Sequence, residues 1–248
     1  DINVYMNKYH PNYSLIKVLN NGIINKTLLI LNEGVPQVAK VFFKSEYSNE
    51  EYKHQVEEIK KCQNTIMKKM PSNIVPMLSI EESLRAGVLI RQFLECNLKE
   101  RIYLMPYLNN IQKIWISFQL LYAVYELSEL GIVHGDLKPE NILLTSNLSV
   151  YLSDIATYKP DYISMDDLGK YTYFFGTNKS ESLQGCYFAP ERLLDKGENS
   201  EKAKNSSMDV FSLGVIIAET FLEKNLFDFS KLLNYKKGNT KFYDIDEI

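Results

Sequence analysis

The chain has 248 residues, 45% of them hydrophobic and 24% charged, which is ordinary for a globular protein long enough to bury a sizeable core. Its formal net charge of -3 and isoelectric point near 5.8 provide no basic field, so nucleic acid and anionic membrane are not expected as main partners. The three cysteines, without a C-x-x-C spacing, are typical of a reduced, cytosolic protein.

The start of the sequence shows no signal peptide. Because residue 1 is Asp rather than Met, we expect the natural N-terminus to be missing. The longest nearly uncharged stretch, around 210–218, is far shorter than the roughly 20 residues that span a bilayer. Any acylation signal or membrane anchor would therefore lie outside this sequence.

The first third of the chain is predicted to be mostly β-structure with one helix. A helix is predicted over 48–70, because Val56, Ile59 and Ile66 recur at helical spacing with charged residues between them. The strand-like runs around it are 14–19, 26–31, 38–43 and 87–94.

The remainder is predicted to be mostly helical. A long helix is expected from about Gln112 to Leu130, ended by Gly131, and another from Asp209 to Leu222. The stripe predicted on the long helix consists of Ile114, Phe118, Leu121 and Val124. Between the helices we expect two short strands, 141–145 and 149–154, and then irregular structure to about residue 190. This order predicts an α+β protein of two lobes.

The stretch "HGDLKPEN", residues 134 to 141, concentrates polar side chains between two apolar runs. A hairpin formed by the two short strands would bring Asn141 and Asp154 together as oxygen ligands for magnesium. Asp136 would lie beside them as a carboxylate able to accept a hydroxyl proton, and Lys138 could neutralise charge on a phosphoryl group. These are the groups that phosphoryl transfer requires.

The same stretch resembles the catalytic loop H-R-D-x-x-x-x-N of protein kinases. Further motifs of that family follow in the expected order: "VAKVF" at 38–42, "SDIA" at 153–156, "YFAPE" at 187–191 and "DVFSLG" at 209–214. The resemblance implies a bilobal kinase-like fold, with a β-rich N-lobe at 12–96. It also implies an α-rich C-lobe at 97–248, which is incomplete because the chain stops soon after the central helix.

The resemblance also implies a site for ATP or another purine nucleotide with Mg²⁺. Lys40 would pair with the nucleotide phosphates, and Glu58 is the chosen ion-pair partner of Lys40, with the adjacent Glu57 left open. Gly22 is the glycine retained from the phosphate-binding loop. Asn141 and Asp154 would hold the metal. The choice between ATP and GTP stays open.

The chain departs from the kinase pattern at several positions. Gly135 replaces the arginine of H-R-D, so no arginine there can bind a phosphorylated activation segment. Ile155 and Ala156 replace the Phe and Gly of D-F-G, and Gln184 replaces a threonine that touches the catalytic groups in serine/threonine kinases. These changes leave open how well the site handles a peptide hydroxyl.

Together with "Y-x-P-D-Y", "YFF-x-T" and "C-Y-x-A-P-E-R", these features resemble the phosphoinositide 3-kinase regulatory subunit four family. Its members are vacuolar-sorting serine/threonine kinase-like partners of the class III phosphatidylinositol 3-kinase catalytic subunit. The resemblance implies a cytoplasmic, nucleotide-binding regulatory domain with weak transfer, peripheral on endosomal or autophagic membranes through its complex or through parts outside this chain.

A fully active serine/threonine protein kinase acting on protein substrates is the alternative. The aromatic run "YTYFFGT", residues 171 to 177, also has two open interpretations, packing on its own lobe or docking on a partner.

Overall fold

The computed structural model describes residues 2–21, 25–43, 49–83, 85–157, 159–176, 185–195, 198 and 205–239. The chain divides into two compact units. The first comprises Asp1–Met70 and Ile74–Leu94, and the second comprises Pro71–Asn73 and Glu95–Ile248. The α+β fold class, an antiparallel sheet unit followed by a largely helical unit, is confirmed. The exact lobe limits 12–96 and 97–248 stay a prediction.

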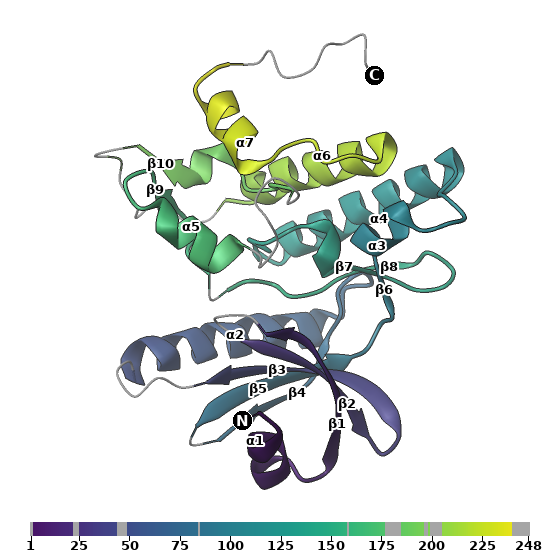
Figure 1. Cartoon of the computed structure of the whole chain (residues 1–248), viewed down its shortest axis with the longest axis vertical. Helices are drawn as coiled ribbons and strands as arrows, with labels where there is room; N and C mark the ends of the chain where they lie inside the picture. Colours follow the sequence, from purple (N-terminus) through teal and green to yellow (C-terminus); the bar gives the residue numbers. More distant parts are fainter. Residues whose placement is uncertain are drawn as a thin grey trace. The chain divides into compact units, whose positions relative to one another are not determined.

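The first unit contains one antiparallel sheet with strand order β1-β2-β3-β5-β4 (Figure 1). Its strands are β1 (Tyr13–Asn21), β2 (Lys26–Asn32), β3 (Val35–Phe43), β4 (Met77–Glu82) and β5 (Ala86–Gln92), and its helices are α1 (Ile2–Tyr9) and α2 (Asn49–Lys69). Alternate residues of the middle strands point to one face and form a core with α1, because side chains alternate along a strand. This core contains Tyr5, Met6, Leu28, Ile30, Ala39, Val41, Ala86, Val88 and Ile90.

The second unit is mainly helical. Its helices are α3 (Leu98–Tyr103), α4 (Asn110–Glu129), α5 (Leu168–Phe175), α6 (Ser207–Leu222) and α7 (Phe229–Lys236). Its short strands are β6 (Cys96–Asn97), β7 (Ile142–Leu144), β8 (Val150–Leu152), β9 (Ile163–Ser164) and β10 (Leu193–Leu194), and its 3-10 turns are η1 (Pro139–Asn141) and η3 (Pro190–Arg192). Asn97 and Asn109 begin α3 and α4 with reciprocal capping boxes, which satisfy backbone donors at both helix starts.

The helices predicted around 48–70, 112–130 and 209–222 are confirmed as α2, α4 and α6. Gly131 follows α4 with a φ of 66°, as a helix-ending glycine should. The prediction of irregular structure up to residue 190 was wrong, because α5 lies within it. Tertiary packing explains α5: the Tyr171 ring stacks on Phe175 in the next turn and on Phe229. No sequence pattern predicted the helices α1, α3 and α7 or the strands β4, β6, β9 and β10.

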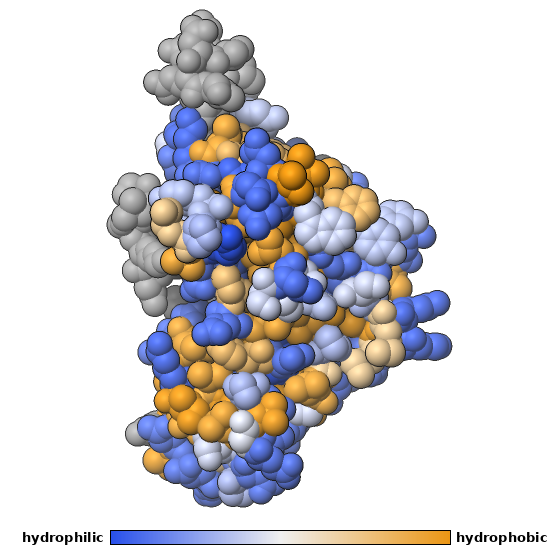
Figure 2. All heavy atoms as spheres, turned by 90° about the vertical axis from the view of Figure 1, so that its right-hand side faces the viewer, coloured by the Kyte–Doolittle hydropathy of each residue, from blue (hydrophilic) through white to orange (hydrophobic). Residues whose placement is uncertain are grey.

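The predicted stripe on α4 is not the core face of that helix. Ile114, Phe118 and Leu121 are 59%, 58% and 54% exposed, and only Val124 of the stripe is buried. The buried face contains Ile116, Leu120, Ala123 and Leu127 instead. Figure 2 views the chain from the side where α4 begins and shows aromatic and other apolar side chains exposed among charged ones. Helix α4 is therefore apolar on both faces.

Within the described residues, none of the helices has the length and hydropathy required to cross a bilayer.

Candidate active site

The loop that follows α4 is anchored by a carboxylate from α6. The backbone N–H groups of His134 and Gly135 donate to the two carboxylate oxygens of Asp209, at 2.6 and 3.0 Å. Asp209 lies in the first turn of α6 and is buried. One buried carboxylate thus satisfies two consecutive backbone donors and fixes the start of the loop.

His134 supports the loop from beneath as a neutral ring. Its Nε2 donates to the carbonyl of Ser153 at 2.9 Å, and its Nδ1 accepts the backbone N–H of Asp136 at 3.3 Å. A single neutral tautomer, protonated at Nε2, satisfies both bonds. Complete burial lowers the pKa of His134 below its usual value, so the uncharged ring is favoured.

The predicted hairpin between Asn141 and Asp154 is confirmed. Strands β7 and β8 pair in antiparallel register, and both the N–H and the hydroxyl of Ser153 donate to the Asn141 carbonyl, at 2.9 and 3.1 Å. Because Asp154 follows Ser153, it lies beside Asn141 at the end of the hairpin. The backbone of Asp154 is left-handed, with a φ of 68°, which is unusual for a residue other than glycine.

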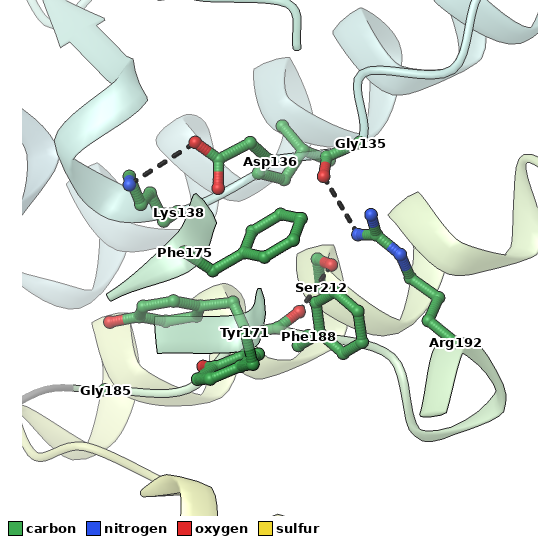
Figure 3. Close-up of a pocket in the computed structure, with 11 residues that line it drawn as sticks. Gly135, Asp136, Lys138, Tyr171, Phe175, Gly185, Phe188, Arg192 and Ser212 are labelled. Carbon is green, nitrogen blue, oxygen red and sulfur yellow. Dashed lines mark hydrogen bonds and ion pairs between the residues drawn. The ribbon is translucent and has the colours of Figure 1, made fainter. Parts of the chain in front are cut away.

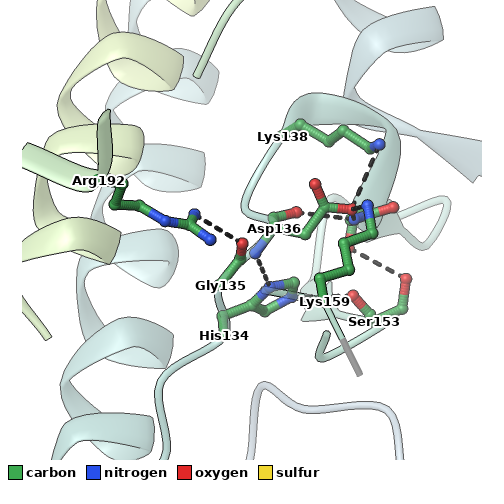
Figure 4. A network of polar contacts seen from close by, with 8 residues as sticks. His134, Gly135, Asp136, Lys138, Ser153, Lys159 and Arg192 are labelled. Atoms are coloured by element: carbon green, nitrogen blue, oxygen red, sulfur yellow. Dashed lines mark hydrogen bonds and ion pairs between the residues drawn. The ribbon is translucent and has the colours of Figure 1, made fainter. Parts of the chain in front are cut away.

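Asp136 is the centre of a polar network (Figure 4). Its Oδ2 accepts from the Asn141 side-chain amide at 3.2 Å and lies 3.3 Å from the Lys138 ammonium and 2.8 Å from the Lys159 ammonium. Burial raises the pKa of this carboxyl, but the charges of Lys138 and Lys159 outweigh burial and hold the pKa well below its usual range. Asp136 is therefore an ionised carboxylate with little tendency to take up a proton.

Lys159 is a member of this network that the sequence did not reveal. Its side chain is 8% exposed, and its ammonium also lies 4.7 Å from the centre of the Phe175 ring. Lys159 occupies the variable position of the motif "Y-x-P-D-Y", residues 158 to 162, so that motif indicated no role for it. Asp209 and Arg192 belong to the motifs "DVFSLG" and "C-Y-x-A-P-E-R", which did not indicate that either residue contacts the catalytic loop.

A small pocket with about 340 Å³ of empty space, part of it open to solvent, lies next to Asp136 (Figure 3). Figure 3 shows the Phe175 ring in the pocket close to Asp136, with Tyr171 and Phe188 nearby and Arg192 reaching toward the Gly135 carbonyl. One wall is therefore the aromatic face of α5, and the opposite wall is the catalytic loop.

The remaining predicted site residues belong to the first unit. Lys40 is a buried residue of β3, opposite Thr27 and Leu89 in the sheet. Glu58 is half-buried on α2, with a carboxylate oxygen 3.9 Å from the Lys61 ammonium. Their pairing stays a prediction. Gly22 lies outside the described residues.

Gln184, the predicted substitute for the kinase threonine, also lies outside the described residues.

The predicted metal ligands have chemistry that suits magnesium. Within the described residues no three His, Cys, Asp or Glu side chains gather as a ready metal site. Magnesium, however, usually binds one or two carboxylates and fills its remaining positions with water and phosphate oxygens. Asn141 uses its side-chain nitrogen to donate to the Asp136 carbonyl and carboxylate, which leaves its amide oxygen as an acceptor for a cation.

A protein kinase domain model matches residues 13–246, so the chain belongs to the protein kinase family. Among relatives, the serine/threonine-protein kinase VPS15 of Arabidopsis thaliana is 36% identical over 243 residues, which cover 94% of this chain and 16% of that protein. VPS15 of Saccharomyces cerevisiae is 36% identical over 239 residues, covering 93% and 16% of the two chains. VPS15 of Schizosaccharomyces pombe is 39% identical over 191 residues, covering 77% and 11%.

These matches confirm the resemblance to vacuolar-sorting serine/threonine kinases that the motifs indicated. The chain is a VPS15-like serine/threonine protein kinase domain. It spans only 11 to 16% of the lengths of these three relatives.

Proposed function

We propose that this domain belongs to a regulatory subunit of a class III phosphatidylinositol 3-kinase complex. It binds a purine nucleotide with magnesium and transfers phosphate to serine or threonine slowly or not at all. Its partner is the lipid-kinase catalytic subunit, and its place is the cytoplasmic surface of endosomal or autophagic membranes. The resemblance to vacuolar-sorting kinases supports the partner and the place.

The observation that carries the nucleotide-binding proposal is the network around Asp136. Asp136, Lys138 and Asn141 hold one another within hydrogen-bond or ion-pair distance, and the β7–β8 hairpin brings Asp154 to the same place. Burying these charged and polar groups together costs desolvation free energy. A loop with only a structural role would not need such a cluster. The arrangement suits a phosphate group and its metal.

Each side chain has a defined task in this proposal. Asp136 orients a hydroxyl and accepts its proton, Lys138 and Lys40 compensate phosphate charge, and Asn141 and Asp154 provide oxygen ligands. Glu58 orients Lys40. Bound magnesium would neutralise charge on the phosphate oxygens.

The same network explains why transfer is expected to be slow. Within the described residues, all side-chain contacts of the Asp136 carboxylate are with Oδ2, so Oδ1 is the oxygen that remains for a hydroxyl. The low pKa of Asp136 makes it a weak base, and efficient general bases have a pKa nearer the working pH. Lys159 lies 2.8 Å from the carboxylate and 4.7 Å from the centre of the Phe175 ring, so both side chains reduce the space beside Asp136 for a peptide.

Nucleotide binding is tested by thermal unfolding of the full-length protein. ATP with magnesium at 100 times its dissociation constant should stabilise the folded state by about 2.7 kcal/mol, and a parallel series with GTP identifies the preferred base. The matched variant is Asp154→Asn, because asparagine also tolerates a left-handed backbone. It should retain the fold and lose the magnesium-dependent part of the shift. No shift with either nucleotide would sink the proposal.

The competing function is a fully active serine/threonine protein kinase, which the retained Asp136 and Lys138 favour. Transfer to a panel of protein substrates at a median enzyme rate, on the order of 10 per second, would support it. Asp136→Asn should abolish that transfer. If transfer persists in this variant, Asp136 is not the base.

A further inference from the structure

Arg192 is a buried arginine that none of the proposed steps uses. It ends the turn η3 and is 4% exposed, although arginine is rarely buried without a partner. Its guanidinium donates to three backbone carbonyls: Nε to Asp161 at 2.8 Å, Nη1 to Gly135 at 2.9 Å and Nη2 to Pro160 at 3.1 Å. The planar fork of arginine can serve several acceptors at once, which a lysine ammonium cannot do in the same geometry.

Two aromatic rings complete the surroundings of this guanidinium. Its central carbon lies 4.1 Å from the centre of the Phe188 ring and 5.1 Å from the centre of the Phe175 ring. Desolvated cation–π contacts of this kind are among the stronger ones. Burial lowers the pKa of Arg192 to about 10, so the group stays charged at neutral pH. Three carbonyls and two ring faces contact the guanidinium directly, and the charges of Asp136 and Asp209 also favour its charged form.

The contacts of Arg192 join parts of the chain that surround the candidate base. Gly135 is held on both sides: its N–H donates to Asp209, and its carbonyl accepts from Arg192. The next residue is Asp136. The other carbonyls, at 160 and 161, belong to the segment that follows Asp154, and Phe175 belongs to α5. The guanidinium thus ties the catalytic loop to the segment beside it.

The geometry points to Arg192 as a positioning residue that holds the catalytic loop to the segment after Asp154 without any phosphate group. In the kinase pattern, the arginine before the catalytic aspartate binds a phosphorylated segment, and this chain has Gly135 there. In this chain the arginine comes from the turn η3 instead of position 135, and it binds backbone carbonyls instead of a phosphate. The arrangement therefore needs no phosphorylation. Its importance for phosphate transfer rests on the proposed function, but the link itself does not.

Amide hydrogen exchange in the full-length protein tests the link directly. In Arg192→Met, exchange at Gly135 and Asp136 should accelerate by about tenfold or more, because bonds to a charged donor are lost beside them. Arg192→Lys keeps the charge but not the fork, and should accelerate exchange at the same amides. The matched control is Lys113→Met, which removes another buried cation, 2.6 Å from Glu223. It should leave exchange at Gly135 and Asp136 unchanged.

Independence from phosphorylation is tested on the wild type, which avoids any variant that fails to fold. Phosphatase treatment should leave exchange at Gly135 and Asp136 unchanged. Faster exchange after phosphatase treatment, or wild-type exchange in both Arg192 variants, would overturn the inference. A protein that binds no nucleotide but shows the expected exchange pattern would refute the proposed function alone.

Where transfer is measurable, Arg192→Lys should lower kcat and leave the KM for nucleotide unchanged, since the fork orients the loop rather than binding phosphate. A rise in KM alone would contradict the positioning role.

Discussion

Gly135 shows how one residue combines a backbone requirement with a change in chemistry. Its φ is 76°, in the left-handed region that glycine enters without a steric penalty. A Cβ at this position would meet only the Ala156 carbonyl, at 3.8 Å, which is an ordinary contact. Glycine therefore suits position 135 because of its left-handed backbone and not because space is short. Arg192 provides the guanidinium that position 135 lacks.

We expect Gly135→Ala to destabilise the protein by roughly 1–2 kcal/mol, the cost of a left-handed residue that carries a Cβ. The control is Gly214→Ala in α6, where φ is not positive and a Cβ meets nothing within 4 Å. That substitution should stabilise the protein by about 0.5–1 kcal/mol, because alanine is the better helix former. Urea unfolding followed by circular dichroism measures both. Equal stability of Gly135→Ala and wild type would contradict the strain argument.

At the scale of elements, α4 and α5 show how apolar residues are shared between core and surface. Periodicity identified α4 but could not choose its buried face, because both faces are apolar. In α5, by contrast, Phe175 is buried against Phe188, while Tyr173 is 48% exposed. Packing on its own lobe therefore accounts for Tyr171 and Phe175. Tyr173 is the ring of this run that remains exposed to solvent.

The two faces of α4 should differ sharply in mutational cost. Leu120→Ala should destabilise the protein by about 2–5 kcal/mol, because it opens a cavity at a position that is 1% exposed. Phe118→Ala, at 58% exposure on the outward face, should change stability by no more than about 0.5 kcal/mol. Chemical denaturation of both variants provides the comparison. Similar costs for both would mean that the outward face is covered in solution.

At the scale of the whole molecule, this chain accounts for 11 to 16% of the lengths of the three VPS15 relatives described above. The kinase domain is thus a small share of the length of these relatives.

If the main output is contact, association with the class III lipid-kinase catalytic subunit should not require phosphate transfer. Asp136→Asn keeps the size of the side chain and removes the carboxylate charge. We expect co-purification of the lipid-kinase subunit with the full-length protein to be unchanged by this substitution. A melting curve must first show that the variant is folded. Loss of the complex in a folded Asp136→Asn variant would favour the enzyme interpretation.

Much of the fold could be predicted because strands and helices repeat their apolar residues locally. Four strands of the first sheet and the helices α2, α4 and α6 follow from such patterns. The short helices α1, α3, α5 and α7 could not be predicted, because short helices depend on contacts with distant residues, such as Tyr171 of α5 on Phe229 of α7. Short helices have little stability of their own.

The sequence by itself determined the family and the kind of chemistry, because Asp136, Lys138 and Asn141 lie within one loop and Asp154 follows one hairpin later. Only the tertiary structure revealed Lys159, Arg192 and Asp209 around that loop. Their partners lie 23, 57 and 75 positions away in sequence. Local spacing carries no information about such contacts, since they form only when the chain has folded and buried charges must find partners.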